Sequence, residues 1–386
     1  MAETPELITT EAELAPLAEH LRAHGWFALD TEFIREKTFW PRLCLVQVAT
    51  TERVACIDPF ACESLDPLLA VLDDPDVTKV LHAAEQDLEI FHLLSGRVPQ
   101  PLFDTQLAAP LLGHPDQAGY ARLVEAVLSV QLAKGHARTD WAERPLPADA
   151  LAYAADDVRY LVPLYQALRE QLQARGRLEW LQADFRALAD PARFERPPAD
   201  AWQRLKGLDR LPAAGRAVAA ALAEWRERTA REQDRPRGHV LRDDALLDIA
   251  RALPKDRRAL GRLRSLRDDV AGRHGDRLLE LVAAARDRAA PPVAERGRGG
   301  NGLDTAGEAL VDALSALVRL RAAREDLNPA TIASRKELAR IVAGEPAAEV
   351  LAGWRGRLAA ADIDAFLAGR TSLRRAPDGG ALIADS

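Results

Sequence analysis

The feature that most constrains this chain is a pair of acids inside an apolar segment, Trp-Phe-Ala-Leu-Asp-Thr-Glu-Phe at residues 26–33. Its aromatic and apolar residues predict a β-strand, and residues two apart on a strand point to the same side of the sheet. Asp30 and Glu32 therefore lie side by side, where two carboxylates repel each other and need a cation. Taken alone, Asp-x-Glu is more typical of a turn or a solvated strand edge.

Two further acidic motifs follow along the chain. Asp87 begins a predicted helix directly after a predicted strand, where a carboxylate also simply favours the helix dipole. Tyr153 and Asp157 are four apart on a helix predicted over residues 147–175, so their side chains share one face of that helix. Asp156 competes with Asp157 as the functional acid, but only Asp157 has the helical spacing from the tyrosine.

The hydrophobic pattern predicts an α/β domain in the first half of the chain. Thr10-Glu-Ala-Glu13 fits a capping box, and the helix that it begins should end near Ala23, before Gly25. Three strands are expected next, and after them helices alternate with short strands, which is typical of a mixed sheet flanked by helices. The three expected strands are 26–33, 43–49 and 53–57.

The second half of the chain is predicted to be helical and to contain a repeat. Ala230-Arg-Glu232 followed by Pro236 corresponds to Ala323-Arg-Glu325 followed by Pro329, and the apolar residues that follow match as well. This pattern indicates two copies of one all-α module. The expected boundaries are an α/β domain at 1–190, a linker at 191–200, a first helical module at 201–288, a flexible linker at 289–303, a second helical module at 304–373 and a frayed tail at 374–386.

Charge is distributed unevenly along the chain, whose formal net charge is −7. Residues 1–196 have 31 acids and 18 bases, a net charge of −13, whereas residues 197–290 have 15 acids and 21 bases, a net charge of +6. An acidic first domain beside a basic module favours chemistry in the first and capture of a polyanion in the second. Scattered solvated charge is the alternative.

The remaining composition excludes several classes of protein. The three cysteines lack a CxxC spacing and indicate reduced core thiols rather than a disulfide or zinc framework. No apolar stretch is long enough to span a membrane, and the first residues do not resemble a signal peptide, so we expect a soluble, cytoplasmic protein. The phosphate-binding loop of ATPases is absent from the sequence.

The order of the three acidic motifs resembles the DEDD exonuclease superfamily, in the subgroup that has a tyrosine in its last motif. Leu-Asp-Thr-Glu-Phe at 29–33, Leu-His-Ala at 81–83, Phe-Asp-Thr-Gln at 103–106, Thr-Asp-Trp-Ala-Glu-Arg-Pro-Leu at 139–146 and Tyr-Ala-Ala-Asp-Asp-Val at 153–158 narrow the likeness to the ribonuclease D family. The two helical modules resemble the tandem HRDC domains of that family. The resemblance implies a ribonuclease H-like fold for the first domain.

The resemblance also implies a mechanism. Asp30, Glu32, Asp87 and Asp157 would bind two Mg²⁺ or Mn²⁺ ions, and Tyr153 would orient the attacking water. The expected reaction is the release of nucleoside 5′-monophosphates from the 3′ end of RNA by two-metal-ion hydrolysis. The expected substrates are structured small RNAs with a single-stranded 3′ end, above all tRNA precursors, and the expected active form is a monomer.

Four more residues are candidates for contacting the substrate. Asp140 and Trp141 are expected to line the groove, and Arg144 is a candidate phosphate contact. His82 is a weaker candidate, because it ends a buried strand and a structural role is favoured. Two other functions remain open at this point: a 3′ to 5′ exonuclease acting on DNA, and a non-catalytic RNA-binding adaptor.

Overall fold

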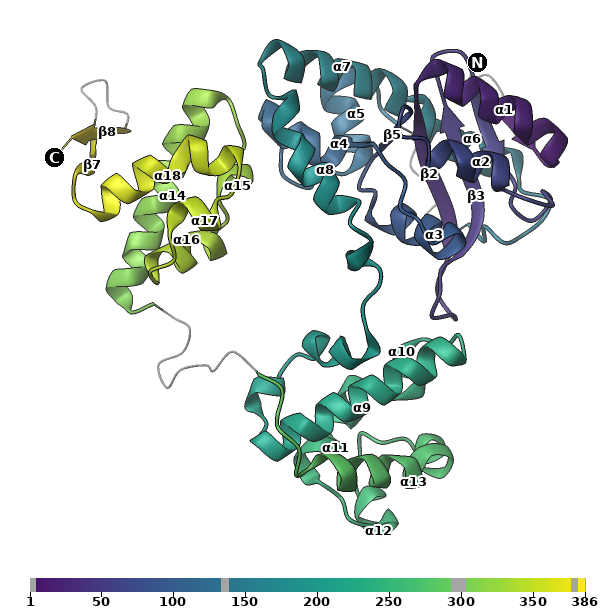
Figure 1. Cartoon of the computed structure of the whole chain (residues 1–386), viewed down its shortest axis with the longest axis vertical. Coiled ribbons are helices and arrows are strands. Elements are labelled where there is room, and N and C mark those ends of the chain that lie inside the picture. The colour runs from purple at the N-terminus through teal and green to yellow at the C-terminus, as the bar shows by residue number, and fades with distance from the viewer. Residues whose placement is uncertain (1–4, 133–138, 293–302, 376–380, 386) are drawn as a thin grey trace. The chain divides into compact units, whose positions relative to one another are not determined.

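The computed structural model describes most of the chain as two compact units (Figure 1). The described residues are 5–132, 139–292, 303–375 and 381–385. The first unit is built from residues 1–33, 43–191 and 302–386, and the second from residues 34–42 and 192–301. The second unit therefore includes the turn that joins the first two long strands of the sheet. In the described part of the chain, no helix has the length and apolarity needed to cross a membrane.

A mixed six-stranded sheet forms the centre of the first unit, in the order β1-β4-β3-β2-β5-β6. β3 and β4 are antiparallel, whereas β1 pairs with β4, β2 with β5 and β5 with β6 in parallel. The three expected strands are present, and β1 is an additional edge strand that the sequence pattern did not predict. The strands are β1 (Glu6–Ile8), β2 (Trp26–Ile34), β3 (Arg42–Ala49), β4 (Val54–Ile57), β5 (Thr78–Leu81) and β6 (Leu102–Asp104).

Helices flank this sheet, which confirms the predicted α/β class (Figure 1). The predicted capping box is present, since Thr10 accepts from the amide of Glu13 and the Glu13 carboxylate accepts from the amide of Thr10. Gly25 ends that helix in the left-handed conformation, with φ 78°. The helices are α1 (Glu11–His24), α2 (Asp66–Leu72), α3 (Glu85–Ser95), α4 (Thr105–Ala108), α5 (Tyr120–Leu128), α6 (Ala148–Arg159), α7 (Leu161–Ala174) and α8 (Gln182–Leu188).

The prediction of a single helix over residues 147–175 is wrong, because the structure has two helices there, α6 and α7, which are divided at Tyr160. Pro163 explains the break. It has no amide hydrogen to donate to the carbonyl of Arg159, and its ring crowds that carbonyl, so a continuous helix is interrupted there. The break leaves Tyr153 and Asp157 together on α6, which is the part of the prediction on which the site depends.

The second unit is helical apart from the turn at residues 34–42. Its core is made by α9, α11 and α13, whose buried side chains include Leu222, Leu246 and Leu278. The expected linker at 191–200 contains two short 3₁₀ helices, Pro191–Arg193 and the first residues of Pro198–Arg204. The helices are α9 (Ala213–Glu232), α10 (Arg237–Val240), α11 (Asp243–Ala252), α12 (Arg257–Leu260) and α13 (Asp268–Ala285).

The second helical module repeats this pattern within the first unit. Helices α9 and α14 end at the matched glutamates, and the matched apolar pairs Leu246 and Leu338, and Ile249 and Ile341, are all buried. Trp180 stacks on Trp354, so the module shares a core with the α/β domain. Its helices are α14 (Thr305–Glu325), α15 (Pro329–Ile332), α16 (Arg335–Val342), α17 (Ala347–Val350) and α18 (Trp354–Leu367).

The end of the chain differs from the expected frayed tail. β7 (Thr371–Arg375) and β8 (Ala381–Asp385) pair as an antiparallel hairpin. The signal was present in the sequence, because the five residues between the strands include Pro-Asp-Gly-Gly, a combination typical of turns. Both strands are short, so their alternation alone was too weak to predict them.

Candidate active site

Three elements of the first unit bring the predicted acids together. Strand β2, inside the sheet, presents Asp30 and Glu32. Asp87 is the third residue of α3, and α6 presents Asp157. Each acid thus comes from the position that the sequence predicted for it, two on a strand, one at a helix start and one on a later helix.

The pKa values of the acids show that they are neighbours. Burial and then repulsion by Asp87, Asp157 and Glu32 raise the pKa of Asp30 well above its usual range. Burial, followed by repulsion from Asp157 and Asp87, raises the pKa of Glu32 to about 8. Burial is also the main reason why the pKa values of Asp87 and Asp157 rise to about 7. The repulsion at Asp30 and Glu32 requires Asp87 and Asp157 to lie close to them, in one partly desolvated cluster.

Tyr153 lies in the same cluster and is a hydrogen-bond donor at any physiological pH. Burial, followed by repulsion from Asp157, Glu32 and Asp30, raises the pKa of Tyr153 to about 12. The ring of Trp141 lies 6.5 Å from the Tyr153 ring, measured between centroids, and Trp141 is only 6% exposed. The tyrosine can therefore position a reacting group, but it cannot serve as a general base.

Thr31 belongs to the site, although the sequence reasoning missed it. Its hydroxyl donates to the Asp87 carboxylate over 2.5 Å, and both residues are buried. Strand alternation assigns Thr31 to the side opposite Asp30 and Glu32, so spacing gave no reason to expect it beside another acid. This hydrogen bond fixes Asp87 against the strand that holds the other two acids.

Asp104 holds the turn that leads into α3. Its buried carboxylate accepts from the amides of Ala83 and Ala84, at 3.2 and 2.9 Å, and from two amides at the start of α4. Ala83 has φ 58°, a left-handed conformation that is unfavourable for alanine and needs such support. Because this turn sets the first residues of α3, Asp104 positions Asp87.

The structure distinguishes Asp157 from its competitor Asp156. The Asp156 side chain forms an ion pair with Arg159, and its backbone carbonyl accepts from the hydroxyl of Tyr120 over 3.1 Å. Asp157 instead contributes to the raised pKa values of Asp30 and Glu32. Tyr120, which the sequence reasoning did not single out, thus anchors α6 beside the acid that faces the cluster.

The candidate groove residues have other roles within the fold. Arg144 donates to both carboxylate oxygens of Asp58, at 2.6 and 2.9 Å, and to the carbonyls of Cys44, Trp141 and Glu143. These bonds engage all three guanidinium nitrogens, so Arg144 would have to exchange one of them to contact a phosphate. Its position indicates an anchor for the segment that holds Trp141.

The other two candidates form local contacts. Asp140 is exposed and accepts from the amide of Ala142 over 3.0 Å, which makes it part of a turn. His82 contacts the hydroxyl of Thr105 at 2.9 Å through Nδ1, and its ring lies 5.5 Å from the Tyr120 ring. Burial lowers the pKa of His82, which favours the neutral imidazole and the structural role that the sequence suggested.

The acids fit a divalent cation in chemistry, although their side chains do not form a closed ligand shell. Among the described residues, no three or more His, Cys, Asp and Glu side chains are grouped in a metal-binding arrangement. Carboxylate oxygens are nevertheless the ligands that Mg²⁺ and Mn²⁺ prefer, and burial and repulsion between acids, with no cation among the causes, raise the pKa values of Asp30 and Glu32. Cation binding would relieve that repulsion.

Comparison with known proteins agrees with this geometry. The family described as 3′-5′ exonuclease matches residues 5–173, and the HRDC domain family matches residues 215–282. Ribonuclease D of Gluconacetobacter diazotrophicus is 42% identical over 359 residues, which cover 91% of this chain and 90% of that protein. Ribonuclease D of Acidiphilium cryptum is 40% identical over 377 residues, covering 96% and 94%.

A solved structure is similar over nearly the whole length. The crystal structure of Escherichia coli RNase D, described as an exoribonuclease involved in structured RNA processing, is 33% identical in sequence. It superposes with a TM-score of 0.82 and covers 95% of this chain and 99% of that one. The likeness therefore includes the helical part of the chain as well as the α/β domain.

Proposed function

This chain belongs to the ribonuclease D family and is a 3′-5′ exoribonuclease, and we propose that Asp30, Glu32, Asp87 and Asp157 are its metal-binding residues. The observation that carries the proposal is the convergence of these acids, since repulsion by Asp87 and Asp157 raises the pKa of both Asp30 and Glu32. A cluster that raises its own pKa values has a high affinity for cations, because each bound cation removes repulsion as well as adding attraction.

Two divalent cations, Mg²⁺ or Mn²⁺, are the cofactors we propose, in keeping with the divalent-metal dependence of this exonuclease family. When bound, such cations supply an activated water and stabilise the leaving oxygen of a phosphodiester. The chain's own residues hold and orient the parts. Thr31 fixes Asp87 by a hydrogen bond, and Asp104 supports the turn before α3.

Tyr153 is proposed to orient the attacking water. Its hydroxyl remains protonated because its pKa is raised to about 12, so it donates a hydrogen bond and does not remove a proton. The nearby Trp141 ring limits the positions open to the Tyr153 ring. The proposed products are nucleoside 5′-monophosphates released one at a time from the 3′ end.

The substrates we propose are structured small RNAs with a single-stranded 3′ end, tRNA precursors first among them. The proposal is supported by the likeness to the E. coli enzyme, which is described as acting in structured RNA processing. The net charge of +6 on residues 197–290 supports a second contact with the body of the RNA. We take the active form to be a monomer.

The test compares two adjacent acids on α6. Asp157→Asn and Asp156→Asn are assayed with a 5′-labelled RNA that has a single-stranded 3′ tail, with Mg²⁺ or with chelator. We expect a ladder that shortens from the 3′ end, at least about 10³-fold slower in Asp157→Asn and nearly unchanged in Asp156→Asn. Equal losses in both variants would refute the assignment of Asp157. A DNA strand of the same sequence, in parallel, measures the preference for RNA.

A further inference from the structure

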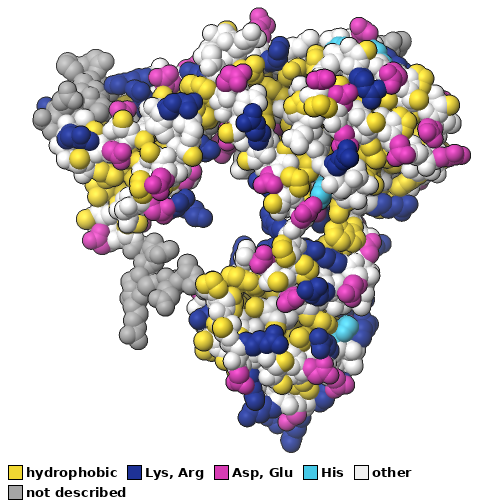
Figure 2. Space-filling view, viewed as in Figure 1, with side chains coloured by type: hydrophobic (Ala, Val, Ile, Leu, Met, Phe, Trp, Pro, Cys, Tyr) yellow, Lys and Arg dark blue, Asp and Glu magenta, His cyan; other side chains and the backbone are white. Residues whose placement is uncertain are grey.

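A pocket in the second unit has an unusual concentration of arginines. It encloses about 540 Å³. Its lining consists of Arg204, Arg226, Arg237, Gly238, Arg242, Asp243 and Asp244. On the face shown in Figure 2, the Lys and Arg side chains of this unit are spread among acidic ones. The unit is therefore not uniformly basic on this face, and four arginines in one lining distinguish the pocket.

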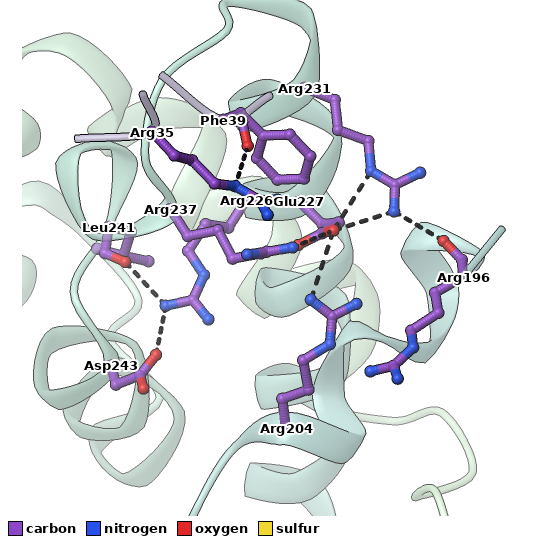
Figure 3. Close-up of polar contacts among 10 residues, drawn as sticks. All are labelled: Arg35, Phe39, Arg196, Arg204, Arg226, Glu227, Arg231, Arg237, Leu241 and Asp243. Carbon is purple, nitrogen blue, oxygen red and sulfur yellow. Dashed lines mark hydrogen bonds and ion pairs between the residues drawn. The ribbon is translucent and has the colours of Figure 1, made fainter. Parts of the chain in front are cut away.

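A single buried glutamate lies among these arginines (Figure 3). Glu227 is 1% exposed, and its carboxylate accepts from Arg231 over 3.0 Å and from Arg237 over 2.9 Å. Arg204 approaches the same carboxylate to 3.8 Å, which is too long for a hydrogen bond. One negative charge thus faces three guanidinium groups, and it cannot balance them.

The excess positive charge is evident at Arg204. Burial is the main reason why the pKa of Arg204 is lowered, and repulsion by Arg237 lowers it further. Attraction to Glu227 raises the pKa, but repulsion by Arg196 and Arg231 offsets part of that rise. A cation that its neighbours repel is stabilised when an anion binds beside it. The geometry gives the same result, since Arg204 makes no hydrogen bond with Glu227.

Arg226 provides a second, independent indication. It is 6% exposed, and its Nη1 donates to the carbonyl of Leu241 over 2.9 Å and to Asp243 over 2.6 Å. Its Nε is buried and has no hydrogen-bond partner among the described residues. A buried donor of this kind is costly to leave unsatisfied, and it lies on an arginine that lines the pocket.

The turn between β2 and β3 fixes one wall of the pocket. The guanidinium of Arg237 lies over the ring of Phe39, 4.5 Å from its centroid, and the Asp234 carboxylate accepts from the amides of Phe39 and Trp40 at 2.9 and 3.0 Å. The Arg237 guanidinium is thus held between the Glu227 carboxylate and the Phe39 ring, so it loses little conformational entropy when it binds a ligand. The site is preorganised on this side.

We propose that this pocket binds a backbone phosphate in the body of the RNA whose 3′ end is hydrolysed, which rests on the proposed function. Guanidinium groups match the oxygens of phosphate by paired hydrogen bonds, and Arg204 and Arg242 have exposed faces from which to make them. The two aspartates of the lining are mostly exposed, with 65% and 53% of their side chains accessible, so they can turn to solvent as the phosphate enters.

The experiment measures binding by the full-length protein in chelator, where no hydrolysis occurs. Fluorescence anisotropy follows a labelled RNA hairpin with a single-stranded 3′ tail, at several salt concentrations. The double variant Arg204→Gln/Arg242→Gln should bind about tenfold more weakly, and its dependence of log K on log salt should be shallower by roughly one to two. Arg228→Gln is the matched control, because that arginine is on α9 but forms a solvent-exposed ion pair with Glu224.

Each outcome decides the proposal. The same affinity and salt dependence in the double variant and in Arg228→Gln would overturn it. Inorganic phosphate and a nucleoside 5′-monophosphate are titrated as well, and if only these lose affinity in the double variant, the pocket serves free phosphates and the RNA assignment is wrong. If the double variant does not fold, Arg242→Gln alone, with 63% of the side chain exposed, repeats the test.

A short substrate separates this proposal from the proposed function. A tetranucleotide consists of a single-stranded 3′ end without an RNA body, so its hydrolysis with Mg²⁺ should be equal in the wild type and the double variant. Failure of the wild type to cut it would refute the proposed function. Normal cutting with unchanged hairpin binding would refute only the pocket.

Discussion

Buried carboxylates are compensated in opposite ways in the two units of this protein. In the first, Asp30 and Glu32 are beside two further acids, and their raised pKa values have no Lys or Arg among the causes. In the second, burial alone would raise the pKa of Glu227, but hydrogen bonds and attraction from Arg237 and Arg231 outweigh it and lower the pKa. The carboxylates are desolvated in both units, but only Glu227 has arginines beside it that compensate its charge.

The difference teaches which buried acids indicate a function. Glu227 is paired with Arg231 and Arg237, so it stabilises the helical unit and should not bind added cations. In the part of the chain that the structure describes, no Lys or Arg is among the causes of the shifted pKa of Asp30, so the repulsion between these acids remains when no metal is bound. An acid cluster that costs stability is the better candidate for binding something from solution.

The largest effect is expected for Asp30→Asn. Exonuclease activity should fall by at least about 10³-fold, while the metal-free protein becomes no less stable, because a repelling charge has been removed. Activity on a labelled RNA and thermal unfolding in chelator check the two halves. A clear loss of stability in chelator would break the comparison, since it would make Asp30 a structural acid like Glu227.

Glu227→Gln should have the opposite profile. Removing the carboxylate that Arg204, Arg231 and Arg237 share takes a charged partner from three partly exposed guanidinium groups, at an expected cost of about 1.5–3 kcal/mol in the stability of the second unit. Denaturant unfolding measures it. Glu224→Gln is the control, because its exposed pair with Arg228 should be worth less than about 1 kcal/mol. Similar losses in both variants would show that burial of the Glu227 charge network is unimportant.

Addition of a divalent cation should distinguish the two clusters directly. Mg²⁺ at a hundred times its dissociation constant should add about 2.7 kcal/mol to the stability of the wild-type catalytic unit, and much less in Asp30→Asn. Thermal scans with increasing Mg²⁺ check this. The Glu227→Gln variant should retain the full response, and its loss there would mean that the two clusters are not independent.

The dependence of folding stability on pH should have opposite signs for the two clusters. Because the folded pKa of Glu32 is raised to about 8, its contribution to metal-free stability is fully present below the unfolded value near 4.5 and is lost as pH rises through about 8. The lowered pKa of Glu227 stabilises the second unit above pH 4.5, and that contribution is lost as pH falls through its folded pKa. Unfolding monitored from pH 3.5 to 9 in chelator would test both signs.

Much of the first domain was predictable because its signals are local. A capping box, a glycine with positive φ and two-residue alternation describe neighbours along the chain, and α1, β2 and β3 follow them closely. The errors are also local in origin. Pro163 divides the long helix, and the short terminal strands gave too little alternation to be recognised.

In the candidate site, too, local spacing predicted some features, whereas contacts between residues far apart in the chain were missed. Spacing within one element placed Asp30 with Glu32 and Tyr153 with Asp157, and the order of the motifs indicated their convergence. Their catalytic roles stay predictions for the experiments above. Spacing could not reveal Thr31, whose hydroxyl reaches Asp87 from 56 positions away, nor could it show that Arg144 is engaged by Asp58.

The sequence by itself determined the acids, their order and the strand or helix on which each lies, because the direction of a side chain within one element depends only on local periodicity. Only the tertiary structure decided how their charges are balanced. Burial and ion pairing depend on contacts between residues far apart in the chain, as when one glutamate of α9 gathers arginines from three segments while the acids around β2 are left to repel one another.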